Sequence, residues 1–171
     1  MRPTTLAPFA AFSVALAACG ETAMLVCYGR DGGTAQNLDP EEISYVAGYL
    51  RYLASESATP AMWTMPTEFD CVEWTLPVPG GGTVLALAKH ITPRINSSVT
   101  YEDLARTIDG GGEGASEADI KDSLLGACGS SGGMVGVKVD ANAPAYHTPE
   151  YLASKARPEG IIVKLVRNPE A

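Results

Sequence analysis

The chain has 171 residues, of which 46% are hydrophobic and 19% are charged, and these values are typical of one globular domain. Acidic residues outnumber basic ones by 20 to 12, giving a net charge of −8. An acidic protein repels phosphate groups, which argues against nucleic acid as a partner. No apolar run reaches the roughly 18 residues that a membrane-spanning helix requires, so no membrane span is predicted.

Residues 1–18 have the pattern of a secretory signal peptide. Arg2 supplies a positive charge near the amino end, an apolar stretch follows, and small residues stand before the expected cleavage point. We therefore expect export, with cleavage after Ala17 or Ala18. The mature protein would be a single domain over residues 19–171.

A second interpretation rests on the same segment. Residues 16–19 read Leu-Ala-Ala-Cys, which resembles the lipobox of bacterial lipoproteins, where the cysteine is lipidated and becomes the new amino terminus. Lipoproteins usually carry a polar tether after that cysteine, whereas here the apolar segment 23–28 follows within four residues. The alternative product is an envelope lipoprotein lipidated at Cys19, with a structural or assembly role.

The first half of the mature chain predicts a strand, a helix and two further strands. The first strand covers residues 24–28. Asp39 followed by Pro-Glu-Glu combines an N-cap acid, a proline at the first helical position and a capping-box glutamate, and helical apolar spacing continues to about Ser55. Residues 61–65 and 69–76 are expected to form an antiparallel pair around a turn at Pro66.

The second half alternates helices and strands. The predicted elements are a helix over 84–91, helices capped by Thr100 and Ser116, a strand over 134–139, a short helix after Thr148, and a strand over 161–167. This order predicts an α/β (α+β) two-layer sandwich, with a small mixed sheet and helices packed mainly on one face.

Cys19, Cys27, Cys71 and Cys128 form an even set, which in an exported chain suggests two disulfides. Four cysteines allow three pairings, and the sequence leaves the choice open. Cys27 would pair with Cys71 if both lie on the outward faces of neighbouring strands. The spacing contains no Cys-x-x-Cys, so neither a zinc site nor a thioredoxin-like site is predicted.

Tyr45, Tyr49 and Tyr52 form a stripe beside the apolar face of the first helix. Either these rings flank the core with their hydroxyls in water, or they form a partner-binding face, since tyrosine is enriched at interface hot spots. Separately, Asn96-Ser97-Ser98 matches the acceptor sequence for N-glycosylation, which would apply in a eukaryotic protein.

No complete catalytic set is found. His90 and His147 lack metal-type spacing, and His90 lies near the end of the helix expected over 84–91, where a cation complements the helix dipole. Residues 129–133 spell Gly-x-Ser-x-Gly, but a helix precedes and a strand follows, which reverses the order of a nucleophile elbow. We expect a loop there, with Gly129 as a helix C-cap. No catalytic residue, cofactor site or metal site is predicted.

Several fragments resemble known effector families. Residues 25–29, Leu-Val-Cys-Tyr-Gly, and residues 160–166 are similar to the opening and closing strands of the smut-virus killer-toxin-like family. Residues 118–137, with Asp-Ile-x-Asp before a glycine turn and a strand, resemble the end of the necrosis-inducing effector domain. The resemblance implies an α/β sandwich that acts by binding, and it transfers no target or site residue. Killer toxins of this kind contain more cysteine.

Together these observations predict a secreted, disulfide-containing effector or toxin-like protein that resembles the small effectors of plant-associated fungi. It would not be an enzyme, and it would bind a host or competitor protein, with the tyrosine stripe as the interaction face. The envelope lipoprotein is the alternative.

Overall fold

The computed structural model describes residues 19–57, 59–65 and 71–171, so the predicted signal peptide lies outside the described residues. The strands are β1 (Val26–Cys27), β2 (Met62–Thr64), β3 (Glu73–Thr75), β4 (Val84–His90), β5 (Ser98–Thr100), β6 (Gly133–Gly136) and β7 (Ile161–Arg167). The helices are α1 (Pro40–Ser55), α2 (Tyr101–Asp109), α3 (Glu117–Asp122), α4 (Leu124–Cys128) and α5 (Pro149–Ser154), with 3-10 turns η1 (Gly129–Ser131) and η2 (Pro144–His147).

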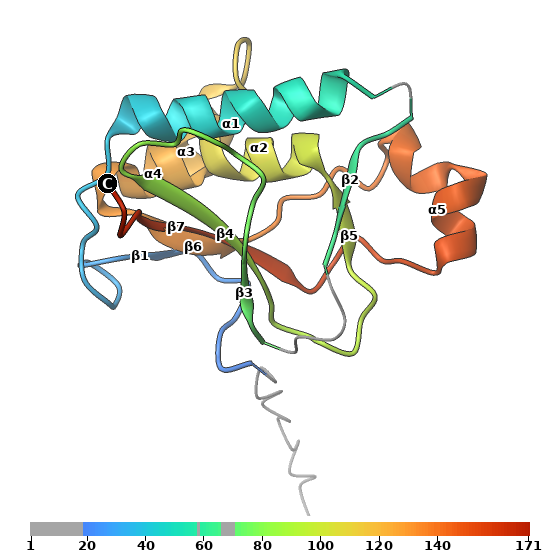
Figure 1. Cartoon of the computed structure of the whole chain (residues 1–171), viewed down its shortest axis with the longest axis horizontal. Helices are drawn as coiled ribbons and strands as arrows, with labels where there is room; N and C mark the ends of the chain where they lie inside the picture. Colours follow the sequence, from blue (N-terminus) through green and yellow to red (C-terminus); the bar gives the residue numbers. More distant parts are fainter. Residues whose placement is uncertain (1–18, 58, 66–70) are drawn as a thin grey trace, which may run out of the picture.

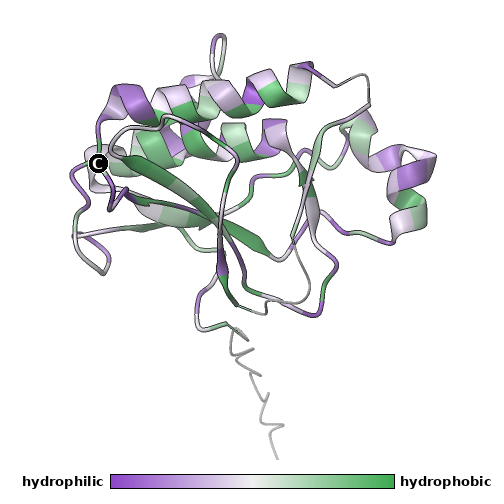
Figure 2. Ribbon diagram, in the orientation of Figure 1, coloured by the Kyte–Doolittle hydropathy of each residue, from purple (hydrophilic) through white to green (hydrophobic). Residues whose placement is uncertain are grey.

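The strands form a five-stranded sheet in the order β1-β6-β7-β4-β3 and a separate pair, β2-β5. Helices α1 and α2 lie side by side over one face of the larger sheet, while α5 lies beside the β2-β5 pair (Figure 1). The predicted two-layer α/β sandwich with helices mainly on one face is confirmed. Figure 2 shows hydrophobic residues gathered where the helices and the sheet face each other.

Helix α1 begins and packs as its sequence predicts. The Asp39 side chain accepts a hydrogen bond from the Glu41 amide at 2.8 Å, and Pro40 occupies the first turn. Its apolar positions are buried against the sheet and α2, namely Ile43, Val46, Ala47 and Leu50.

The helix predicted over residues 84–91 is wrong, because Val84–His90 is the central strand β4. Its side chains are buried or partly buried on both faces of the sheet, so the sequence shows an unbroken apolar run without the alternation of a one-sided strand. His90, expected near a helix end, is the fully buried last residue of this strand.

The strand partners also differ from the prediction. β2 pairs with β5 and β3 with β4, so the expected pairing of residues 61–65 with residues 69–76 does not form, and the turn at Pro66 lies outside the described residues. The sheet expected to be mixed has antiparallel pairing in each described ladder. The connections through α1 (from β1 to β3) and through α2 to α4 (from β4 to β6) join strands that run in the same direction, but other strands lie between them, so no parallel ladder forms.

One predicted helix boundary is refined and another is confirmed. The helix expected from Ser116 is divided at Ser123, whose backbone is extended and whose hydroxyl caps α4 by accepting from the Gly126 amide at 3.1 Å. Gly129, with φ of 53°, caps α4 at its C-terminal end, as expected.

The two expected disulfides are present, as Cys19–Cys71 and Cys27–Cys128. The pairing of Cys27 with Cys71 suggested by strand parity is wrong, because Cys27 in edge strand β1 lies next to α4, where Cys128 ends that helix. The Cys19 sulfur is bonded to Cys71, and a lipid anchor would need that same sulfur. The lipoprotein alternative therefore conflicts with the structure.

Across the described ranges, no helix combines the length and the apolar character that a membrane crossing requires.

Candidate functional site

The predicted tyrosine stripe forms a continuous row of rings on the outer side of α1, which we call the tyrosine ladder (Tyr45, Tyr49 and Tyr52). The Tyr49 ring centroid lies 6.1 Å from that of Tyr45 and 5.6 Å from that of Tyr52, both within the range of favourable aromatic contacts. Tyr45 is 46% exposed and Tyr52 is 50% exposed, whereas Tyr49 is partly buried between them. The ladder thus presents large apolar side chains to solvent from a helix whose other side is fixed in the core.

One end of the ladder is held in place by a backbone contact. The Tyr45 hydroxyl donates a hydrogen bond to the carbonyl of Pro79 at 3.0 Å, which ties α1 to the loop between β3 and β4. At the other end the negative charge of Glu56 raises the pKa of the Tyr52 hydroxyl. Rings that are already ordered lose little conformational entropy when a partner covers them.

Gly48 lies within the ladder face, three residues after Tyr45 and four before Tyr52. Its position is exposed, and a Cβ built there meets no atom within 4 Å. A glycine inside a helix destabilises it by about 0.5–1 kcal/mol relative to alanine, so alanine would suit the fold better. Without a side chain at Gly48, a partner could approach the helix backbone closely between the rings.

Acidic residues stand one helical turn beyond each end of the ladder. Glu41 precedes Tyr45 by four residues and Glu56 follows Tyr52 by four, and both are exposed. Tyrosine ring faces attract cations, and these carboxylates add to that preference. The face therefore suits a partner surface that carries arginine or lysine.

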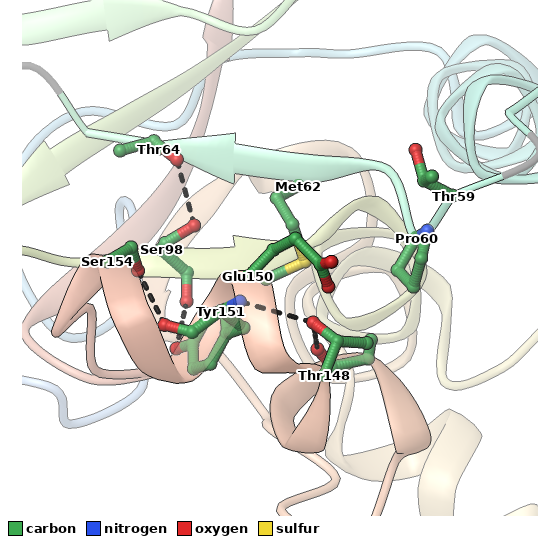
Figure 3. A pocket seen from close by; sticks show the side chains of 10 residues that line it. Thr59, Pro60, Met62, Thr64, Ser98, Thr148, Glu150, Tyr151 and Ser154 are labelled. Atoms are coloured by element: carbon green, nitrogen blue, oxygen red, sulfur yellow. Dashed lines mark hydrogen bonds between the residues drawn. The ribbon is translucent and has the colours of Figure 1, made fainter.

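A separate cavity of about 370 Å³ lies between the β2-β5 pair and α5 (Figure 3). Its walls carry hydroxyls and one carboxylate, from Thr64, Ser98, Thr148, Ser154 and Glu150. The Tyr151 hydroxyl beside it donates to the Ser98 carbonyl at 3.0 Å, and burial raises the pKa of this hydroxyl to about 12. The described lining holds no basic side chain.

A second cavity of about 210 Å³ shares Pro60 and Ala145 with the first. At its wall the Asp103 side chain, only 2% exposed, accepts hydrogen bonds from the Tyr146 hydroxyl at 2.5 Å and from the Asp140 amide at 3.1 Å. Burial, with the Asp103 carboxylate next, raises the pKa of Tyr146. These bonds join α2 to the 140–146 segment, so the pair has a structural role.

Charged residues also lie on the sheet face opposite α1 and α2. The segment 19–24, which we call the strap, lies over them. Glu21 of the strap contacts Lys89 of β4 at 2.5 Å and Lys164 of β7 at 3.0 Å, and Lys164 also contacts Glu73. The Ala23 carbonyl accepts from the Gly136 amide at 2.9 Å. These contacts and the Cys19–Cys71 disulfide hold the strap on the sheet.

Asn96 is partly buried, and its side-chain amide donates to the Ser154 carbonyl at 3.1 Å. The Ser98 hydroxyl of the same acceptor sequence pairs with Thr64 at 2.9 Å. Both groups are thus engaged within the fold, so a glycan would have to be added before this region folds. Glycosylation of Asn96 stays a prediction.

The remaining sequence candidates have structural roles. Residues 129–131 form η1, and the Ser130 and Ser131 carbonyls accept backbone hydrogen bonds from the segment before α1. A ring nitrogen of His147 lies 3.0 Å from the Ala141 carbonyl. Within the described part of the chain, no three His, Cys, Asp or Glu side chains converge in a way that could hold a metal ion. The cavity beside β2 has no counterpart in the sequence motifs, because its walls come from segments far apart in the chain.

No protein-family model, curated protein sequence or solved structure matches this chain.

Proposed function

We propose that this is a secreted, disulfide-crosslinked binding protein of the effector or toxin-like kind, which engages a protein target through the tyrosine ladder. The observation that carries the proposal is the ladder itself, with Tyr45 and Tyr52 about half exposed on a helix fixed by its buried side. Aromatic rings presented rigidly on a helix are typical of interface hot spots. Gly48 supports the proposal, because folding alone would favour alanine there.

The chemistry around the ladder specifies the kind of target. The protein carries a net charge of −8, and Glu41 and Glu56 flank the rings. A target surface with exposed arginine or lysine would gain cation–π contacts with the rings and charge attraction from the carboxylates. The target surface is therefore expected to be basic.

The two disulfides support action outside the producing cell. Cys27–Cys128 closes a sequence separation of 101 residues and Cys19–Cys71 one of 52. Such crosslinks persist in oxidising compartments and resist unfolding and proteolysis. In this account the protein acts by binding, so a clear turnover of any substrate in a broad hydrolase panel would contradict it.

The experiment is cell binding of the fluorescently labelled mature chain, measured by flow cytometry across plant, fungal and animal cells. We expect saturable binding to one class, weakened about tenfold or more when Tyr45, Tyr49 and Tyr52 are all changed to alanine. The control changes Met24 and Ile120 to alanine, because these side chains are also apolar and exposed but lie off the ladder. Binding by the ladder variant at wild-type strength would overturn the proposal.

A further inference from the structure

Strand β2 has one open edge. The Tyr101 amide donates to the Ala61 carbonyl at 3.2 Å and the Met65 amide to the Ser97 carbonyl at 2.9 Å. Residues 61, 63 and 65 therefore turn their backbone groups toward β5, and the intervening Met62 and Thr64 turn theirs away from it. β2 has no other strand neighbour among the described residues, so these outward groups form an unpaired edge.

On the outer edge of β5, by contrast, the backbone groups have hydrogen-bond partners. The Ser98 amide donates to the Arg157 carbonyl at 3.0 Å, and the Thr100 amide donates to the Tyr146 hydroxyl at 2.9 Å. The Ser98 carbonyl accepts from the Tyr151 hydroxyl at 3.0 Å. The fold thus provides hydrogen-bond partners for these three outward groups of β5, whereas the outward groups of β2 have no strand partner among the described residues.

The open edge adjoins the cavity of about 370 Å³ beside α5. Side chains alternate across a strand, so Met62 and Thr64 share the face that lines this cavity, while Met65, in the alternate set, is buried in the core. Figure 3 shows Met62 and Thr64 on β2 opposite Glu150 and Tyr151 of α5. A residue placed directly opposite Met62 or Thr64 on an added strand would have its side chain on this same face.

We propose that β2 is a docking edge for an extended peptide of a partner protein, which adds as a third strand and directs a lysine or arginine side chain into the cavity beside α5. Backbone pairing to Met62 and Thr64 supplies the hydrogen bonds, as in other complexes formed by strand addition. The charge of the side chain follows from the lining, in which Glu150 is the charged residue and no described residue is basic. This edge is distinct from the tyrosine ladder, so the inference does not depend on the proposed function.

The probe is a set of blocked peptides of the form Thr-Val-X-Val-Thr, in which X is varied, titrated into the ¹⁵N-labelled mature chain and followed by NMR. With X as lysine or arginine, the amide resonances of Met62 and Thr64 are expected to move downfield and to become protected from exchange. The affinity should exceed that of the glutamate peptide by about threefold or more. No movement of these two amides for any X at about 2 mM would overturn the proposal, as would equal affinity for lysine and glutamate.

Two matched pairs sharpen the test. In the peptide, N-methylation of X should abolish binding, because X faces β2, whereas N-methylation of both valines should leave it intact. In the protein, Glu150→Gln should remove the preference for lysine over glutamate, whereas Glu117→Gln, at another exposed first-turn position, in α3, should keep it. Equal effects within either pair would overturn the proposal. The triple alanine ladder variant should bind these peptides as the wild type does.

Discussion

Arg51 of α1 clasps Asp109 at the end of α2 through two hydrogen bonds of 2.6 Å. The side chains are 23% and 11% exposed, and the Asp109 carboxylate raises the pKa of the guanidinium. Asp109 also accepts from the Gly111 amide at 2.9 Å, so the pair joins both helices to the glycine loop that follows α2. Helix α1, which carries the tyrosine ladder, is fixed to α2 at this point.

Asp109→Asn should therefore destabilise the fold. The substitution leaves the partly buried Arg51 with only its longer contact to Glu102, at 3.3 Å, as a charged partner. We expect a loss of about 1–3 kcal/mol in the free energy of unfolding, measured by urea denaturation. Glu159→Gln is the control, because Glu159 pairs with Arg157 at an exposed site and its loss should cost under about 0.5 kcal/mol. Equal losses from the two substitutions would contradict this role for Arg51.

Two glycines should respond to alanine in opposite directions. At Gly48 an added Cβ meets nothing within 4 Å, so Gly48→Ala should stabilise the protein by about 0.5–1 kcal/mol. At Gly126 the Cβ would lie 2.0 Å from the Ile120 carbonyl oxygen, so Gly126→Ala should destabilise it by about 1–3 kcal/mol. Thermal unfolding of the two variants measures both effects, and a destabilising Gly48→Ala would mean that this position is needed by the fold.

The strap should loosen in acid. Burial raises the pKa of Glu21, but its bonds to Lys89 and Lys164 outweigh this, and the net shift is below the ordinary 4.5. A lowered carboxyl pKa stabilises the fold above its unfolded value, and this contribution is lost as the pH falls through the folded value. Between about pH 6 and pH 3 the wild type should lose more stability than Glu21→Gln, as measured by the urea midpoint. Parallel losses in the two proteins would rule out this role.

How much of this could be predicted from sequence depended on whether the deciding contact was local. The start of α1 was predicted because Asp39 and Pro40 fix it within one turn, and the spacing of Tyr45, Tyr49 and Tyr52 predicted that they form one stripe beside the buried face. These signals lie within one helix, so no knowledge of the remaining fold was required.

The incorrect predictions concern features that are determined by contacts between residues far apart in the sequence. Residues 84–88 form an unbroken apolar run because both faces of β4 are buried or partly buried, and a short apolar run does not distinguish a buried strand from a helix. Cys27 pairs with Cys128 because β1 lies at the sheet edge beside α4, which strand parity does not reveal. The open edge of β2 depends on β5 and α5, which lie far along the chain.

The account also predicts the covalent form of the exported protein. The intact mass should correspond to a chain that begins at Ala18 or Cys19, and it should gain four hydrogens on reduction of the two disulfides. In a eukaryotic producer, a series of hexose additions would place a glycan at Asn96. A mass that carries acyl chains, with Cys19 first, would contradict both the Cys19–Cys71 bond and simple secretion.

The central claim, that the tyrosine ladder is the binding face, is tested most directly by comparing Gly48→Ala with Gly48→Gln in the cell-binding measurement. Both substitutions remove the destabilising glycine from an exposed helical position, but only glutamine adds bulk between the rings. We predict a graded loss, in which the alanine variant binds about twofold to threefold more weakly than the wild type and the glutamine variant about tenfold more weakly. Equal binding by the two variants, with both folded, would show that the partner does not cover this face of α1.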